Sequence, residues 1–146
     1  MPDNDIPNTI VPPRKVLPLP EAIMKLAPGS RWHLVGFDWE GLVWEDDPAL
    51  KPSREAVEAL AEEILAAAPM KELRRQRDNR MKETDWVTMR AMRLGEPIPQ
   101  EWQDYMNALA DLPNTATPFF IEGRILGGVE WPARPDGKPA GPFRGY

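Results

Sequence analysis

The chain of 146 residues has room for one modest domain or two very small ones, so a large buried core is not expected. The absence of cysteine excludes disulfides, thiolate nucleophiles and cysteine-based metal sites. No segment approaches the roughly 20 consecutive apolar residues of a membrane span, and the first ten residues lack the basic and apolar regions of a signal peptide. We therefore expect a soluble protein that is made inside the cell and does not engage a membrane.

The net charge of −5 hides a separation of charge along the sequence. Residues 38–63 contain nine acidic residues against two basic ones, whereas residues 70–93 contain eight basic residues against four acidic ones. Blocks of opposite charge attract each other, and salt weakens such attraction. The two blocks are therefore expected to meet within one chain or between neighbouring copies.

Residues 1–20 are predicted to form an extended arm, because they contain six of the 18 prolines. Proline has no N–H donor and favours an extended residue before it, which excludes a helix or a central strand. The arm is also rich in Ile, Val and Leu, so it is expected to lie either along a partner or along the protein's own core. A second group of six prolines, in residues 113–142, predicts an extended segment at the other end.

A β-hairpin is predicted after a short helical turn at residues 21–26. Residues 32–35 and 42–44 are rich in aromatic and β-branched side chains, and residues 36–41 supply the connection. Phe37 and Trp39 give this connection an apolar tip. An isolated hairpin is marginal in water, so it should pack on a helix or pair with a strand of another chain.

A long amphipathic helix is predicted from Ser53, which has the side chain of an N-cap. The apolar residues that follow have the spacing of one buried helix face. Pro69 is expected to end or kink this helix, and a second helical stretch with a basic surface follows from Met70.

Two shorter helices, residues 85–94 and 100–112, are predicted to pair as a helical hairpin. Thr84 is the expected cap of the first helix, Gly95 its end, and Pro113 the end of the second. Trp86 and Trp102 should face each other as the core of the pair. Further along, a short hairpin or extended piece is expected around residues 119–131.

No residue pattern of a catalytic centre, phosphate loop or metal site occurs in this sequence. The single histidine, His33, is interpreted as a strand residue rather than as a ligand or base. The adjacent carboxylates at positions 46–47 and 62–63 lack supporting ligands, and neighbours on a helix point about 100° apart. We expect no enzyme activity, no cofactor and no bound metal.

The basic segment 71–82 raises the possibility of nucleic-acid binding through Arg74, Arg77 and Arg80. Interrupting acidic residues and the acidic balance of the chain favour an acidic protein surface as the counterpart. The six tryptophans also indicate a protein partner, since tryptophan and arginine are enriched at interface hot spots. Trp39 and Trp131 are the best interface candidates among them, and Phe37 is grouped with Trp39.

The order of motifs resembles the tail assembly chaperone family of tailed bacteriophages. The first part is R-x-x-R-D-N-R-x-x-x-T-D-W at residues 74–86, which includes Asp85. The second is the helix with Trp102, Tyr105, Leu109 and Pro113, and the Trp-Pro pair at residues 131–132 is a third. The resemblance covers roughly 60 residues, and residues 28–52 look more loosely like a module found at the front of phage tail-associated proteins.

The resemblance implies a factor that binds a phage tail or tail-fibre protein in the host cytoplasm and helps it fold, assemble or attach. Other copies of the same chain are a further candidate partner. The extended arms depart from the simplest family pattern, and they favour an alternative, a permanent structural component of the tail or fibre-attachment region. The predicted fold class is α+β, with an arm (1–20), a hairpin module (21–52), a helical chaperone-like region (53–113) and a tail (114–146).

Overall fold

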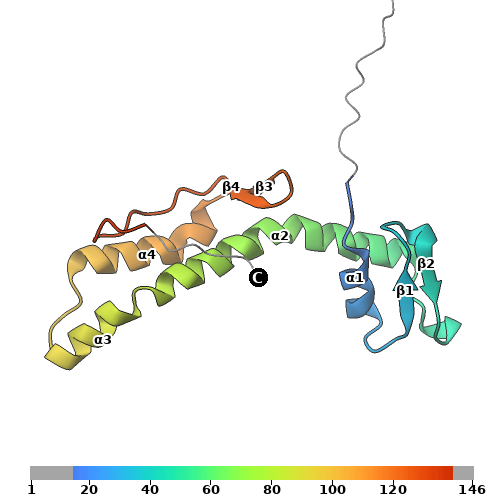
Figure 1. The fold of residues 1–146 in the computed structure, drawn as a ribbon, viewed down its shortest axis with the longest axis horizontal. Helices are drawn as coiled ribbons and strands as arrows, with labels where there is room; N and C mark the ends of the chain where they lie inside the picture. The colour runs from blue at the N-terminus through green and yellow to red at the C-terminus, as the bar shows by residue number, and fades with distance from the viewer. Residues whose placement is uncertain (1–14, 140–146) are drawn as a thin grey trace, which may run out of the picture. The chain divides into compact units, whose positions relative to one another are not determined.

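The computed structural model of this protein describes residues 15–139 and has the predicted α+β fold (Figure 1). The chain divides into two compact units, Met1–Ala66 and Ala67–Tyr146, and a long central helix contributes residues to both. Residues 1–14, which hold most of the predicted arm, and residues 140–146 lie outside the described part.

The first unit contains the predicted hairpin. Strand β1 (Trp32–Leu34) pairs antiparallel with β2 (Leu42–Trp44), and the 3-10 helix η1 (Trp39–Gly41) lies in the connection. Trp32 is opposite Trp44 and Leu34 is opposite Leu42, and these four half-buried side chains pack on the helices of the unit. The middle pair, His33 and Val43, faces the solvent, as strand alternation requires.

The hairpin packs on two helices, α1 (Leu19–Leu26) and the beginning of α2 (Arg54–Lys82). A second 3-10 helix, η2 (Pro48–Leu50), precedes α2. The Ala56 N–H donates a 3.1 Å hydrogen bond to the Ser53 hydroxyl, which confirms the predicted N-cap. The core of this unit is small and is formed by α1 and α2. Its buried members are Leu19, Ala22, Ile23, Val57 and Ala61.

Helix α1 begins at Leu19, inside the segment that was expected to exclude a helix. The expectation is wrong for residues 19–20, because Pro20 stands in the first turn. A proline there gives up an N–H that has no partner within the helix in any case. The proline therefore starts this helix rather than preventing it.

The predicted long kinked helix is confirmed in the centre of the chain. Helix α2 continues through Pro69, which removes one backbone hydrogen bond without ending the helix. A turn at Glu83 and Thr84 then separates α2 from α3 (Asp85–Leu94). Gly95 ends α3 with φ 63° and ψ 28°, and the Glu96 N–H donates a 3.0 Å hydrogen bond to the Ala91 carbonyl.

The second unit is built on the predicted helical hairpin of α3 and α4 (Gln100–Thr115). Helix α4 extends beyond Pro113, which was expected to end it. A proline in the last turn removes only its own N–H, and the Ala116 N–H still donates a 2.9 Å bond to the Leu112 carbonyl. The last strands, β3 (Phe119–Ile121) and β4 (Ile125–Gly127), form the second hairpin.

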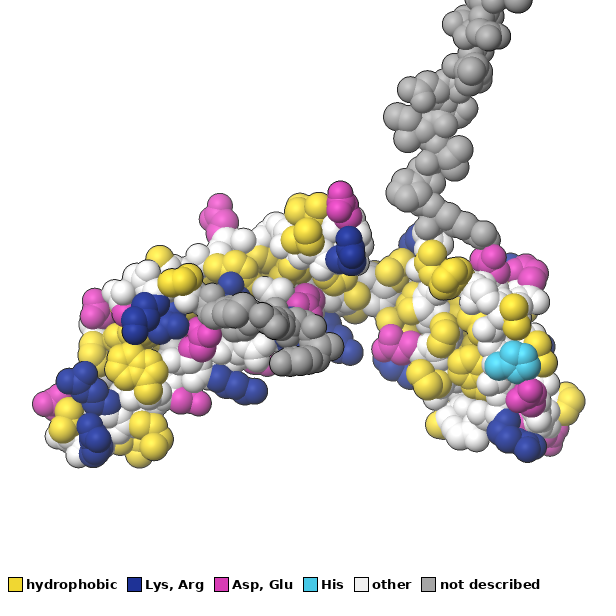
Figure 2. All heavy atoms as spheres, viewed as in Figure 1, with side chains coloured by type: hydrophobic (Ala, Val, Ile, Leu, Met, Phe, Trp, Pro, Cys, Tyr) yellow, Lys and Arg dark blue, Asp and Glu magenta, His cyan; other side chains and the backbone are white. Residues whose placement is uncertain are grey.

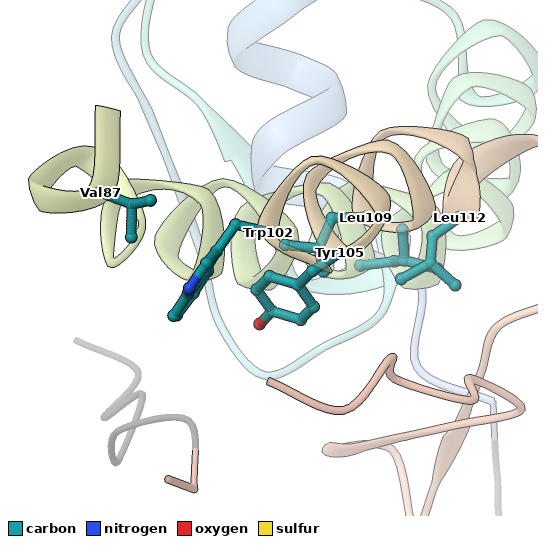
Figure 3. Packing of buried hydrophobic residues seen from close by; sticks show 6 residues of the cluster. Val87, Trp102, Tyr105, Leu109 and Leu112 are labelled. Carbon is teal, nitrogen blue, oxygen red and sulfur yellow. The ribbon is translucent and has the colours of Figure 1, made fainter. Parts of the chain in front are cut away.

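One face of α4 supplies most of the core of the second unit, as its apolar spacing predicts (Figure 3). Leu73 comes from α2 and Val87 from α3. Half-buried residues from the end of the chain, including Leu126, Val129 and Trp131, complete the cluster. Its buried members are Leu73, Val87, Trp102, Tyr105, Leu109 and Leu112.

Candidate protein-binding surface

Two of the predicted partner contacts, Arg80 and Trp131, lie against each other inside the second unit. The guanidinium carbon of Arg80 is 3.7 Å from the centre of the Trp131 ring, and both side chains are half-buried. This is a cation–π contact between α2 and the segment after β4. The structure thus gives both residues an intramolecular role in holding the end of the chain on the helices.

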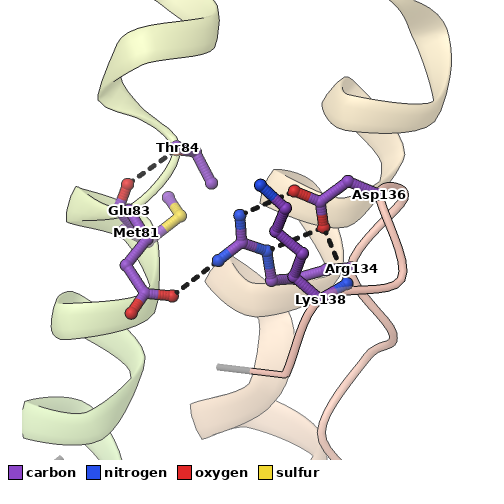
Figure 4. Close-up of polar contacts among 6 residues, drawn as sticks. All are labelled: Met81, Glu83, Thr84, Arg134, Asp136 and Lys138. Atoms are coloured by element: carbon purple, nitrogen blue, oxygen red, sulfur yellow. Dashed lines mark hydrogen bonds and ion pairs between the residues drawn. The ribbon is translucent and has the colours of Figure 1, made fainter. Parts of the chain in front are cut away.

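Arg134 fastens the same segment to the turn after α2 (Figure 4). Its guanidinium forms a 3.0 Å ion pair with Glu83 and a 2.8 Å ion pair with Asp136, and only 12% of its side chain is exposed. The hydrogen bond from Arg134 to Asp136 contributes most to raising the pKa of Arg134. Residues 128–136, which we call the C-terminal strap, are therefore bound in place by charge as well as by packing.

Thr84 lies at the N-cap position of α3, as predicted, but its side chain makes no capping hydrogen bond. Its backbone is already helical, with φ −92° and ψ −7°, whereas a capping residue needs an extended backbone. The Thr84 hydroxyl instead donates a 2.6 Å hydrogen bond to the Met81 carbonyl at the end of α2 (Figure 4). Buried Thr84 thus contacts both helices, because its hydroxyl bonds the end of α2 and its carbonyl accepts a 2.9 Å hydrogen bond from the Val87 N–H of α3.

The basic segment 71–82 uses part of its charge internally. Arg75 forms a 2.7 Å ion pair with Glu72, and its hydrogen bonds lower the pKa of that carboxyl. Arg77 forms a 2.8 Å ion pair with Asp78. Arg74 is exposed. The segment is thus less basic at its surface than its sequence suggests.

The predicted contacts of the first unit differ in exposure. Phe37, at the tip of the hairpin, is 72% exposed. Trp39 packs on the core, with the Lys51 ammonium 5.5 Å from its ring centre. His33 is exposed and lies 3.0 Å from Glu45. Among the residues described, no three His, Asp or Glu side chains gather as a metal site requires.

The outward face of α3 is the most apolar exposed helix surface of the second unit, and sequence reasoning missed it. Met89 is 69% exposed and Met92 is 76% exposed, while Trp86 and Leu94 are each about half exposed. Arg90 and Arg93 lie among them on the same helix and are also exposed. Figure 2 shows apolar and basic side chains interleaved over the helix that Figure 1 labels α3.

Two adjoining hollows lie on the outward face of α3. An open one is lined by Trp86, Met89, Arg90, Arg93 and Leu94. A narrower groove of about 190 Å³ runs between α3 and the loop to α4, and Trp86 and Arg90 line both hollows. We call the residues that line the open hollow, together with Met92, the α3 surface.

The position of Trp86 corrects the expectation that it is buried with Trp102. The two rings do meet, with centres 5.6 Å apart and planes at 80°. Trp102 is only 6% exposed, whereas Trp86 is 49% exposed. The sequence did hold a signal for this exposed face, because α3 has apolar residues on both of its sides. Val87 and Ala91 are its buried residues, so the apolar residues on the other side are left exposed.

The charges of the α3 surface are not balanced within the described part of the chain. Neither Arg90 nor Arg93 forms an ion pair with a carboxylate of residues 15–139. The lining of the open hollow contains no acidic side chain. An apolar surface with uncompensated arginines can bind a protein segment that offers apolar and acidic groups.

Comparison with protein families identifies the region that carries this surface. Residues 70–136 match the sequence model of the family described as phage tail assembly chaperone protein. The predicted family is confirmed for this region. The matched residues include α3, α4, β3 and β4.

The family match supports a general role in phage tail assembly. No curated protein and no solved structure matches this chain. Within residues 15–139, no helix has both the length and the apolar character needed to cross a membrane.

Proposed function

We propose that this protein is a phage tail assembly chaperone that binds a tail protein, a tail-fibre protein in particular, through the α3 surface. The observation that carries this proposal is the exposed group of Trp86, Met89, Met92 and Leu94 inside the family-matched region. Large exposed apolar groups on a folded chain are typical of interaction sites. The proposed role is to cover an apolar surface of the tail protein until assembly covers it permanently.

The side chains of the α3 surface suit a partner that changes during assembly. Methionine is flexible and polarizable, so Met89 and Met92 can adapt to different apolar shapes. Trp86 is held in place by its edge-to-face contact with buried Trp102, which gives the surface one rigid element. Flexible contacts beside a fixed ring allow binding without a deep pocket.

The proposed role is binding without catalysis, and it takes place in the host cytoplasm while tails assemble. The cation–π contact of Arg80 with Trp131 and the ion pair of Arg134 with Glu83 hold the second unit itself together. No cofactor or metal enters the proposal. Nucleic acid is not the proposed partner, because the basic segment forms ion pairs with its own acidic residues.

Co-expression with the tail-fibre protein tests this function. We expect a larger soluble and correctly trimeric fraction of the fibre protein with this chain than without it. The variant Met89→Asp should lose the effect, and the matched control Met24→Asp, at a residue 56% exposed on α1, should keep it. Equal yields of fibre protein with and without the chain would contradict the fibre assignment.

A second experiment separates the chaperone from the alternative structural role. If phage particles are purified after infection, a chaperone that leaves the tail should be absent from them. Stoichiometric copies in the particle would instead favour a permanent component of the tail or fibre-attachment region.

A further inference from the structure

The α3 surface has the residue spacing of a helix that packs on another helix. Residues 86, 89, 90, 93 and 94 line its open hollow, and they follow the i, i+3, i+4, i+7, i+8 pattern. A helix of 10 residues is about 15 Å long, so this row extends along nearly its whole length. The core side of α3, with Val87 and Ala91, is already occupied by the second unit. A second packing row therefore remains that no residue between 15 and 139 buries.

The geometry of this row favours a helical partner over an extended one. Side chains of a helix form ridges and grooves, and a second helix fills them by ridge-into-groove packing. An extended peptide gains much of its affinity from hydrogen bonds to a free strand edge. The α3 surface offers side chains and no strand, so an extended segment would lack those bonds.

The charges of the row specify the partner further. A partner that covers Trp86 and Met89 also removes water from Arg90 and Arg93, which lie in the same lining. Covering an arginine costs free energy unless a carboxylate or another acceptor replaces the water. Because Arg90 and Arg93 have no carboxylate partner among residues 15–139, the acidic groups must come from the occupant.

We propose that the α3 surface binds an amphipathic α-helix of a tail protein whose apolar row is bordered by Asp or Glu side chains. This inference rests on the proposed function and names the chemistry of its partner. The narrow groove beside Trp86 accepts one apolar side chain of that helix, while its carboxylates pair with Arg90 and Arg93. Complementary charge fixes the direction and register of the bound helix.

A second copy of this chain suits the surface less well. The acidic block of the first unit includes half-buried Glu58 and exposed Glu62, but their carboxylates already pair with Arg54 and Lys15. Docking of these residues on α3 would break existing ion pairs before it formed new ones.

The test uses the full chain and two fluorescent peptides of about 14 residues, each forming about four helical turns. Both carry Leu at the i, i+3, i+4, i+7 positions, and they differ only in having Glu or Lys along the borders. Fluorescence anisotropy measures binding to the wild type, to the double variant Arg90→Glu/Arg93→Glu, and to the control Arg31→Glu/Arg124→Glu. The control changes the net charge equally at two exposed arginines outside the surface.

We expect the wild type and the control to bind the Glu peptide at least about tenfold more tightly than the Lys peptide, a difference of about 1.4 kcal/mol. The variant Arg90→Glu/Arg93→Glu should reverse this preference, and binding of the Lys peptide would show that it remains folded. Equal binding of both peptides by the wild type would overturn the proposal. Sedimentation that shows an oligomer dispersed by the double variant, together with no peptide binding, would assign the surface to a second copy.

Co-purification of the tail protein separates this inference from the proposed function. If the wild type and Arg90→Glu/Arg93→Glu retain the tail protein equally, the chaperone role stands and the acidic-helix inference fails. If the wild type retains no tail protein, the proposed function itself fails.

Discussion

Trp102 joins the helices of the second unit through contacts with two other aromatic rings. Its ring meets Trp86 on α3 at 5.6 Å and Tyr105 on α4 at 6.0 Å, both edge to face. It is 6% exposed, whereas Trp86 is 49% exposed. The two tryptophans of the motif thus have different roles, one in the core and one at the surface.

The variant Trp102→Ala should lower the free energy of unfolding by about 3 to 5 kcal/mol, because it removes a large buried ring. Trp86→Ala is the matched variant, and it should cost about 0.5 to 1.5 kcal/mol, the value of its aromatic pair. Chemical denaturation of both variants measures the difference. A stable Trp102→Ala protein that loses only its tail partner would make this ring a contact instead of a core residue.

Tyr105 makes the second unit sensitive to alkaline pH. Burial is the largest influence on its phenol and raises its pKa above the usual value of about 10, although Arg80 and Arg134 act in the opposite direction. The unfolded chain therefore ionises first as the pH rises. The stabilising contribution is complete below about pH 10 and is lost as the pH rises through the pKa of the folded state.

Denaturation between about pH 9 and 12 tests this prediction. The experiment is done in a Tyr146→Phe background, so that Tyr105 is the one remaining tyrosine. Adding Tyr105→Phe should make the loss of stability with pH less steep. Parallel pH profiles with and without the Tyr105 phenol would show that its pKa is not raised by folding.

At the scale of elements, local sequence signals predicted most of the fold. The hairpin at residues 32–44, the cap at Ser53, the stop at Gly95 and the buried row of α4 all follow from nearby residues. The errors concern proline and threonine at helix ends. The helix ends at Pro20, Pro113 and Thr84 are set by which backbone hydrogen bonds form there. Residue preferences alone do not determine those bonds.

The candidate site was harder to predict, because exposure depends on distant parts of the chain. Arg80 and Trp131 are 51 positions apart in sequence, and only folding of the C-terminal strap on α2 brings them together. Which side of α3 faces outward depends on which side is buried, and the fold buries the side with Val87 and Ala91. Composition pointed to tryptophan and arginine as interface residues, but it did not single out Trp86, Arg90 and Arg93 on α3.

The end of α3 depends on one backbone conformation. Gly95 has φ 63°, and a Cβ added there would meet nothing within 4 Å. Gly95→Ala should therefore cost about 1 to 2 kcal/mol of unfolding free energy from backbone strain alone. Gly95→Asn should cost less, since asparagine tolerates this conformation. Equal stability of the wild type and the two variants in thermal denaturation would show that the end of α3 does not require a left-handed residue at position 95.

At the scale of the whole molecule, the two units have separate buried clusters. One cluster includes Ile23 and the other Leu109, both fully buried, and the clusters share no residue. Ile23→Ala should cost about 2 to 5 kcal/mol and expose amides of β1 and β2 to hydrogen exchange. Leu109→Ala should do the same for α3 and α4. Uniform loss of protection throughout the chain in both variants would contradict separate cores.

The division of the molecule also bears on function, because the family match covers residues 70–136 and leaves the whole first unit outside it. Under the proposed function, the second unit binds the tail protein. The first unit also has exposed apolar side chains, Phe37 and Met24 among them. Contacts made by these side chains in the cell can therefore be compared with contacts made by the α3 surface.

The most direct test places a photoactivatable crosslinking residue at position 89 during phage assembly, with position 24 as the matched site. Both methionines are more than half exposed, at 69% and 56%, and they lie in different units. We expect a tail protein to be crosslinked from position 89 and not from position 24. Crosslinking of the tail protein from position 24, with none from position 89, would contradict the assignment of the α3 surface as the binding site.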